Sequence, residues 1–100
     1  MPVADVFDGE LRYTVIHWGY DNGTEQNGGY VEARSIATDE KVWGLLVYKN
    51  SYIKGLEVDV QDIFITSIQL ENEGKTLIVT NEAHSVFHID LKTLKVQRVE

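Results

Sequence analysis

The segment 63–99, IFITSIQLENEGKTLIVTNEAHSVFHIDLKTLKVQRV, constrains the fold more than any other part of the chain. Short runs of Ile, Val, Leu, Phe and Thr alternate there with polar clusters at 71–74, 81–85 and 91–93. Such runs, each closed by turn-forming residues, are typical of strands joined by tight turns. The segment therefore predicts a four-stranded antiparallel meander.

Two finer features of this meander can be predicted. Alternation places Ile63 and Ile65 on one face of the run 63–70 but Ile68 and Leu70 on the other. This change of parity indicates a β-bulge near Thr66 and Ser67. In the run 86–90, alternation places Phe87 and Ile89 toward the core. The last strand alternates less cleanly and is expected at an edge of the sheet.

The first half of the chain has the same character. Three strands are expected at 11–20, 30–36 and 41–49, the last two forming a hairpin around 37–40. The run 41–49, KVWGLLVYK, is the most hydrophobic window of the chain, which predicts a central position in a sheet. Gly44 within it indicates a bulge or the close approach of another backbone.

Three segments are less regular. Residues 1–10 are polar and have no strand pattern. The segment 21–29, DNGTEQNGG, is rich in turn-forming residues and is expected to be a long hairpin loop, either a solvated connector or a binding loop. In the segment 50–62 apolar and charged residues alternate, which favours an edge strand.

These patterns predict an all-β protein with about seven to nine antiparallel strands and little or no helix. The strands are expected to form two packed sheets or a partly open barrel. The 100 residues suffice for a single domain, 1–100, made of two similar halves at about 11–49 and 56–99.

Charge and composition exclude several classes of function. The net charge of −7 disfavours nucleic-acid binding, which depends on Lys and Arg neutralising phosphates. The chain has no cysteine, so disulfides, thiolate metal sites and thiol catalysis are excluded. No apolar run approaches the roughly 20 residues that span a bilayer, and residues 1–5 carry no secretory signal pattern. A cytoplasmic protein without membrane contact is expected.

Catalytic and metal sites are not predicted. His84 and His88 are four residues apart, which on a strand separates them by about 13 Å. No nucleophile elbow, phosphate loop, zinc-protease motif or dinucleotide fingerprint is present. We therefore expect no enzyme activity, no cofactor and no metal.

The aromatic residues carry the clearest functional signal. Trp18 and Tyr20 precede the loop 21–29 and Tyr30 follows it, so all three are expected at one end of a hairpin. They belong either to the core or to an exposed platform, because Trp and Tyr are frequent anchors of interfaces. On the second interpretation Asp21 and Glu25 favour a basic partner.

Two segments resemble blade repeats of β-propeller proteins of the quinoprotein-like and YVTN kind. In 73–96, GKTLIVTN is similar to the pattern G-K-x-L-Y-V-x-N, and VFHIDLKT is similar to V-x-x-I-D-x-x-T. In 29–47, GYVEA and TDEKVW resemble G-x-V-x-A and T-G-E-x-x-W, with Asp39 in place of the glycine. The resemblance implies meandering blade-like sheets. A blade takes about 40–45 residues and a propeller has 4–8 blades, so 100 residues cannot close one alone.

The resulting expectation is a non-catalytic binding module that acts through its surface and associates with itself through an exposed strand. The candidate binding residues are Trp18, Tyr20, Asp21, Glu25 and Tyr30. The alternative is an acidic inhibitor or immunity-type protein that neutralises a basic enzyme. No residue matches a quinone contact, so the resemblance carries no cofactor.

Overall fold

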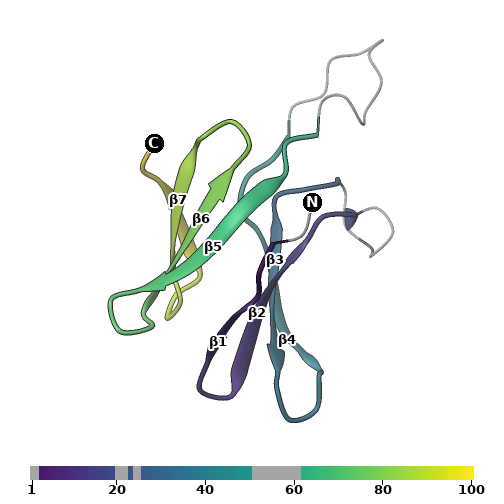
Figure 1. The fold of residues 1–100 in the computed structure, drawn as a ribbon, viewed down its shortest axis with the longest axis vertical. Helices are drawn as coiled ribbons and strands as arrows, with labels where there is room; N and C mark the ends of the chain where they lie inside the picture. The colour runs from purple at the N-terminus through teal and green to yellow at the C-terminus, as the bar shows by residue number, and fades with distance from the viewer. Residues whose placement is uncertain (1–2, 20–22, 24–25, 51–61) are drawn as a thin grey trace.

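The computed structural model describes residues 3–19, 23, 26–50 and 62–100, which form two four-stranded antiparallel sheets with essentially no helix (Figure 1). The all-β prediction is confirmed, and the sheets are open and packed together rather than closed into a barrel. The strands of the first sheet, in spatial order, are β1 (Val6–Asp8), β2 (Leu11–Ile16), β3 (Tyr30–Ser35) and β4 (Lys41–Leu46). Those of the second are β5 (Ile65–Glu71), β6 (Thr76–Asn81), β7 (Val86–Asp90) and β8 (Lys95–Arg98).

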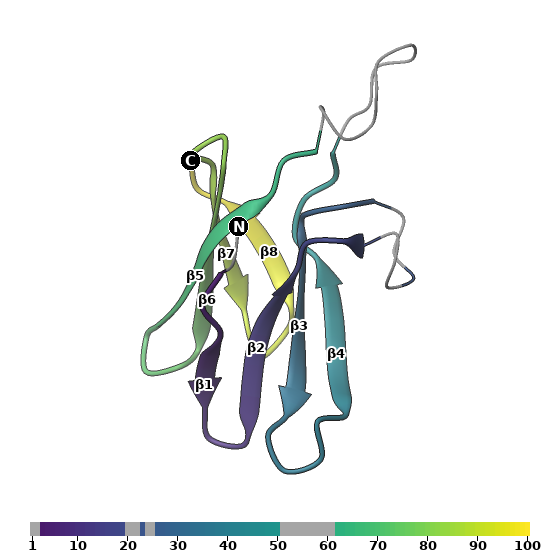
Figure 2. The same ribbon diagram turned by 45° about the vertical axis from the view of Figure 1, so that its right-hand side comes forward.

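One apolar face of each sheet contributes to a single shared core. Along each strand, every second side chain points to that face. Strand pairing places these side chains opposite those of the neighbouring strand, as in Val15 opposite Val31 and Leu77 opposite Ile89. β1 also lies against β5 of the other sheet (Figure 2). The buried hydrophobic residues are Tyr13, Val31, Ala33, Val47, Ile65, Ile68, Leu77, Val79, Phe87 and Ile89.

The second sheet follows the sequence prediction closely. The register between β5 and β6 shifts between Ile65 and Ser67, where the parity change indicated a bulge. Phe87 and Ile89 are buried, and β8 lies at the edge. These features could be predicted because hairpin partners are close in sequence.

The prediction that 41–49 forms a central strand is wrong, because β4 lies at the edge of the first sheet. The bulge of this strand is at Val42 rather than Gly44, since Ala33 pairs with Trp43 and the next residue of β3 pairs with Lys41. Val42 is 55% exposed. A Cβ added to Gly44 would lie 3.0 Å from Cε of the Lys41 side chain. The group close to Gly44 is therefore a side chain and not another backbone.

Several strand ends also differ from the prediction. β2 ends at Ile16 instead of residue 20, and β4 ends at Leu46 instead of residue 49. The short strand β1 was not expected, because residues 1–10 show no pattern of their own; it exists through pairing with β2, as in Val6 opposite Tyr13. The edge strand predicted at 50–62 falls almost wholly outside the described residues.

The predicted loop 21–29 is not simply a solvated connector, because its last residues are buried. Gly28 donates a backbone hydrogen bond to the His17 carbonyl at 2.8 Å, and the Gly29 carbonyl accepts one from Val47 at 2.7 Å. The buried Gln26 amide donates to the carbonyls of Gly28 and Tyr48 at 2.9 and 3.1 Å. Side-chain and backbone hydrogen bonds therefore replace the strand ladder at this end of the first sheet.

Tyr48 connects this loop end to the second sheet. Its ring stacks on Phe87 with centroids 5.2 Å apart, and its hydroxyl donates a hydrogen bond to the Ile63 carbonyl at 2.5 Å. Burial raises the pKa of Tyr48 far above its usual range, against a smaller opposing effect of a hydrogen bond with Asn81. The phenol therefore stays protonated and keeps donating to Ile63 at neutral pH.

None of the described residues belongs to a helix that has both the length and the apolar character to cross a bilayer.

The contact between Gly28 and Ile63 gives a test of this junction. Gly28 and Gly23 both have positive φ, of 75° and 85°, but a Cβ on Gly28 would lie 2.5 Å from the Ile63 carbonyl oxygen, whereas one on Gly23 meets nothing within 4 Å. Gly23→Ala should lower the free energy of unfolding by about 1–2 kcal/mol through backbone strain alone. Gly28→Ala should lower it by more, since the carbonyl must also move. Urea unfolding of both variants measures the difference, and equal losses would contradict this junction.

Candidate functional site

The structure places two of the five predicted binding residues. Trp18 follows β2 and is 57% exposed, while Tyr30 begins β3 and is half-buried between Ile16 and Leu46. Tyr20, Asp21 and Glu25 lie outside the described residues. The exposure of Trp18 fits the platform interpretation rather than the core interpretation.

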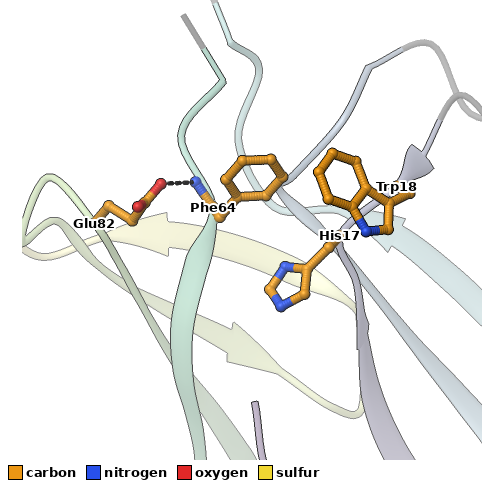
Figure 3. Close-up of a pocket in the computed structure, with 4 residues that line it drawn as sticks. All are labelled: His17, Trp18, Phe64 and Glu82. Atoms are coloured by element: carbon orange, nitrogen blue, oxygen red, sulfur yellow. Dashed lines mark hydrogen bonds between the residues drawn. The ribbon is translucent and has the colours of Figure 1, made fainter. Parts of the chain in front are cut away.

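Trp18 borders a pocket of about 260 Å³ between the two sheets (Figure 3). His17 and Trp18 follow β2 of the first sheet, Phe64 precedes β5, and Glu82 lies in the turn between β6 and β7. These four residues come from three separate parts of the sequence. The pocket therefore forms only when the two sheets are packed together.

Three rings give the pocket its apolar walls. The Trp18 and Phe64 centroids are 5.4 Å apart with planes inclined by 65°, and those of His17 and Phe64 are 5.5 Å apart at 83°. Edge-to-face contacts of this kind are favourable, because the positive edge of one ring meets the negative face of the other. Phe64 thus supports both neighbours and holds Trp18 in place although the indole is largely in solvent.

Glu82 supplies the negative charge of the pocket. Its Oε1 accepts a hydrogen bond from the Phe64 backbone N–H at 2.8 Å, and its own N–H donates to the Phe64 carbonyl at 2.9 Å (Figure 3). These two bonds fix the carboxylate beside Phe64. Within the described ranges no Lys or Arg forms an ion pair with Glu82, so its charge is not neutralised there.

His17 is the unusual polar group of the site. Both ring nitrogens are buried and have no hydrogen-bond partner among the described residues. Burying a polar atom without a partner costs roughly 1–3 kcal/mol. Among the described residues, the imidazole therefore contributes its ring contact with Phe64 to the pocket and no polar contact.

A second hollow lies on the outer face of the second sheet, around His88, Asp90, Lys95 and Gln97. The carboxylate in this hollow has a structural role, because Asp90 Oδ1 accepts hydrogen bonds from the backbone N–H groups of Lys92 and Thr93 at 2.9 and 3.3 Å. This arrangement stabilises the turn after β7. In the part of the chain that the structure describes, no cluster of three His, Asp or Glu side chains could hold a metal ion.

The sequence identified Trp18 but not His17, Phe64 or Glu82 as parts of one site. His17 is adjacent to Trp18 and could have been included on proximity. Phe64 and Glu82 carried no signal, because Phe64 meets His17 and Trp18 across the two halves of the chain and Glu82 joins the site through Phe64. Sequence reasoning that proceeds hairpin by hairpin cannot find such a contact.

Comparisons with protein-family models, with curated proteins and with solved structures gave no match to this chain. The resemblance to propeller blades therefore stays a prediction.

The unpartnered nitrogens of His17 lead to a test. His17→Phe removes two buried polar atoms that make no hydrogen bonds to described residues and keeps an aromatic ring against Phe64, so stability should stay unchanged or rise by up to about 1 kcal/mol.

Gln26→Leu is the matched control, because it removes an amide that makes three hydrogen bonds to described residues, including one accepted from Asn50 N–H at 2.9 Å. It should destabilise the fold by about 2 kcal/mol or more. Thermal and urea unfolding measure both variants. A His17→Phe variant as unstable as Gln26→Leu would show that the imidazole has a partner in solution.

Proposed function

We propose that this protein is a non-catalytic binding module that holds a protein partner at the pocket formed by His17, Trp18, Phe64 and Glu82. The observation that carries the proposal is the exposed Trp18 indole, which stands on Phe64 at the mouth of a pocket between two rigid sheets. Trp residues with this combination of exposure and support are frequent hot spots of interfaces, because they lose little conformational entropy on binding.

The composition of the pocket supports binding rather than turnover. Among the described residues, its polar groups are one carboxylate that also accepts a backbone hydrogen bond and one imidazole without an orienting partner. A general base needs a partner that fixes its tautomer and a nucleophile within reach. Aromatic walls with one charge are better suited to recognising a side chain.

Trp18→Ala should remove most of the binding energy at this site. Short random peptides are selected on the full-length chain, and their affinities are measured by fluorescence anisotropy. Truncation of a hot-spot residue costs about 2 kcal/mol or more, which corresponds to an affinity about 30-fold weaker.

Phe7→Ala is the matched control, because Phe7 is an exposed aromatic residue, 61% accessible, on the separate strand β1. Its affinity for the selected peptides should equal that of the wild type. Peptides that bind Trp18→Ala as well as the wild type would overturn the proposal.

Self-association through β4 is a second candidate, favoured by one specific observation. β4 is an unpaired edge in the described structure, and its Val42 is 55% exposed. The other edges are less suitable: β1 has three residues, β8 has four of which two are basic, and β5 lies beside β1, whereas β4 has six residues of which only Lys41 is charged. Two copies of a long apolar edge can pair through their backbone groups.

Sedimentation velocity at micromolar concentrations tests this candidate. The wild-type chain should form a dimer, and Val42→Lys should shift it to the monomer, since a charge on an edge strand opposes pairing. Val99→Lys places the same change on another exposed valine, 42% accessible and outside β4, and should leave the dimer intact. A wild-type chain that sediments only as a monomer excludes pairing through β4.

A further inference from the structure

We propose that the occupant of the pocket is an arginine side chain of the partner protein. This inference rests on the proposed function and specifies its ligand chemistry. It depends on three properties of the pocket: its size, the order of its walls and the hydrogen-bonding character of its polar atoms.

The size favours a single side chain. The pocket volume of about 260 Å³ lies below the roughly 300–1,000 Å³ of sites that hold drug-sized ligands or cofactors. The pocket is also formed from both sheets at the surface, where a side chain projecting from another protein can enter.

The order of the walls favours a long side chain with a charged end. Figure 3 shows Trp18 and Glu82 on opposite sides of Phe64, with His17 next to the ring. A ligand that contacts all of them passes across the aromatic rings before it reaches the carboxylate. Arginine has this form, because its apolar stem packs on ring faces while its head remains charged.

The polar atoms favour a donor. The accessible polar group of the pocket is the Glu82 carboxylate, which can only accept hydrogen bonds when ionised. The ring faces of Trp18 and Phe64 carry negative electrostatic potential and attract cations. The guanidinium group has five donors in one plane and also stacks on aromatic rings. It therefore suits both the carboxylate and the aromatic walls of the pocket better than the compact lysine ammonium.

The charge of the protein agrees with this assignment. The net charge is −7, and Glu82 has no basic partner in the described part of the chain. The electrostatic field of such a protein attracts a basic partner, and this attraction weakens as the ionic strength rises.

The test uses the full-length ¹⁵N-labelled chain and two capped tripeptides, acetyl-Gly-Arg-Gly-amide and the same peptide with citrulline. Citrulline has nearly the same shape as arginine but no charge. Amide and indole shifts are followed by NMR in the wild type, Glu82→Gln and Trp18→Ala. Trp18→Phe identifies the Trp18 indole signal, because Trp43 gives a second one.

Arginine should shift the signals of His17, Trp18 and Glu82 and bind about 10-fold more tightly than citrulline, as expected for a charge-assisted contact with a cation–π component. Glu82→Gln keeps an oxygen that can accept from Phe64 N–H, so the fold is preserved. It should bring the arginine affinity down to that of citrulline. Trp18→Ala should weaken both tripeptides.

Equal affinity of the two tripeptides, shifts at another surface, or no shifts at all would overturn the arginine assignment. The outcomes that contradict the proposed function differ from those that contradict the arginine assignment. If the selected peptides depend on Trp18 but show no preference for arginine over citrulline, the binding module stands and only the assignment falls. If they do not depend on Trp18, the proposed function falls as well.

Discussion

The structure depends on the burial of one apolar face of each sheet against the other. A sheet with one hydrophobic face has to bury it against another element, because the apolar side chains of that face would otherwise remain solvated. The most deeply buried residues include Val31 from the first sheet and Leu77 and Ile89 from the second. Neither half of this chain should therefore fold alone, although each has complete strand pairing within itself.

The same burial creates the pocket. Phe64 is placed by its position just before β5, and the bonds between its backbone and Glu82 keep it there. Tyr48 crosses from the first sheet to bond Ile63, the residue before Phe64. The aromatic walls are thus connected through a few hydrogen bonds to the junction between the sheets, so a change that loosens the junction also changes the pocket.

Local patterns were sufficient for most of the fold. The strands of the second sheet, the bulge at Thr66–Ser67 and the inward positions of Phe87 and Ile89 follow from alternation and turn residues within one hairpin. Hydrophobicity did not reveal how many neighbours a strand has. The apolar strand β4 lies at an edge, where its bulge leaves Val42 in solvent.

What could not be predicted depends on contacts that a segment makes with another part of the chain. β1 has no pattern of its own and becomes a strand by pairing with β2. The burial of Gly28 requires the Ile63 carbonyl, which lies in another part of the chain. The candidate site combines the same kinds of contact, and for this reason only its most conspicuous residue, Trp18, could be identified from the sequence.

Two departures from ordinary packing coincide in this pocket. A large indole remains mostly in solvent although an aromatic neighbour is available to cover it, and an imidazole has two buried nitrogens that find no hydrogen-bond partner in the described part of the chain. Each departure works against folding, by exposed apolar area or by lost hydrogen bonds. Native sequences satisfy these requirements nearly everywhere and depart from them mainly at functional sites. Both occur in one pocket with a carboxylate that no Lys or Arg of the described residues pairs with. This coincidence is the physical reason to propose the binding function here rather than on the well-paired faces of the sheets.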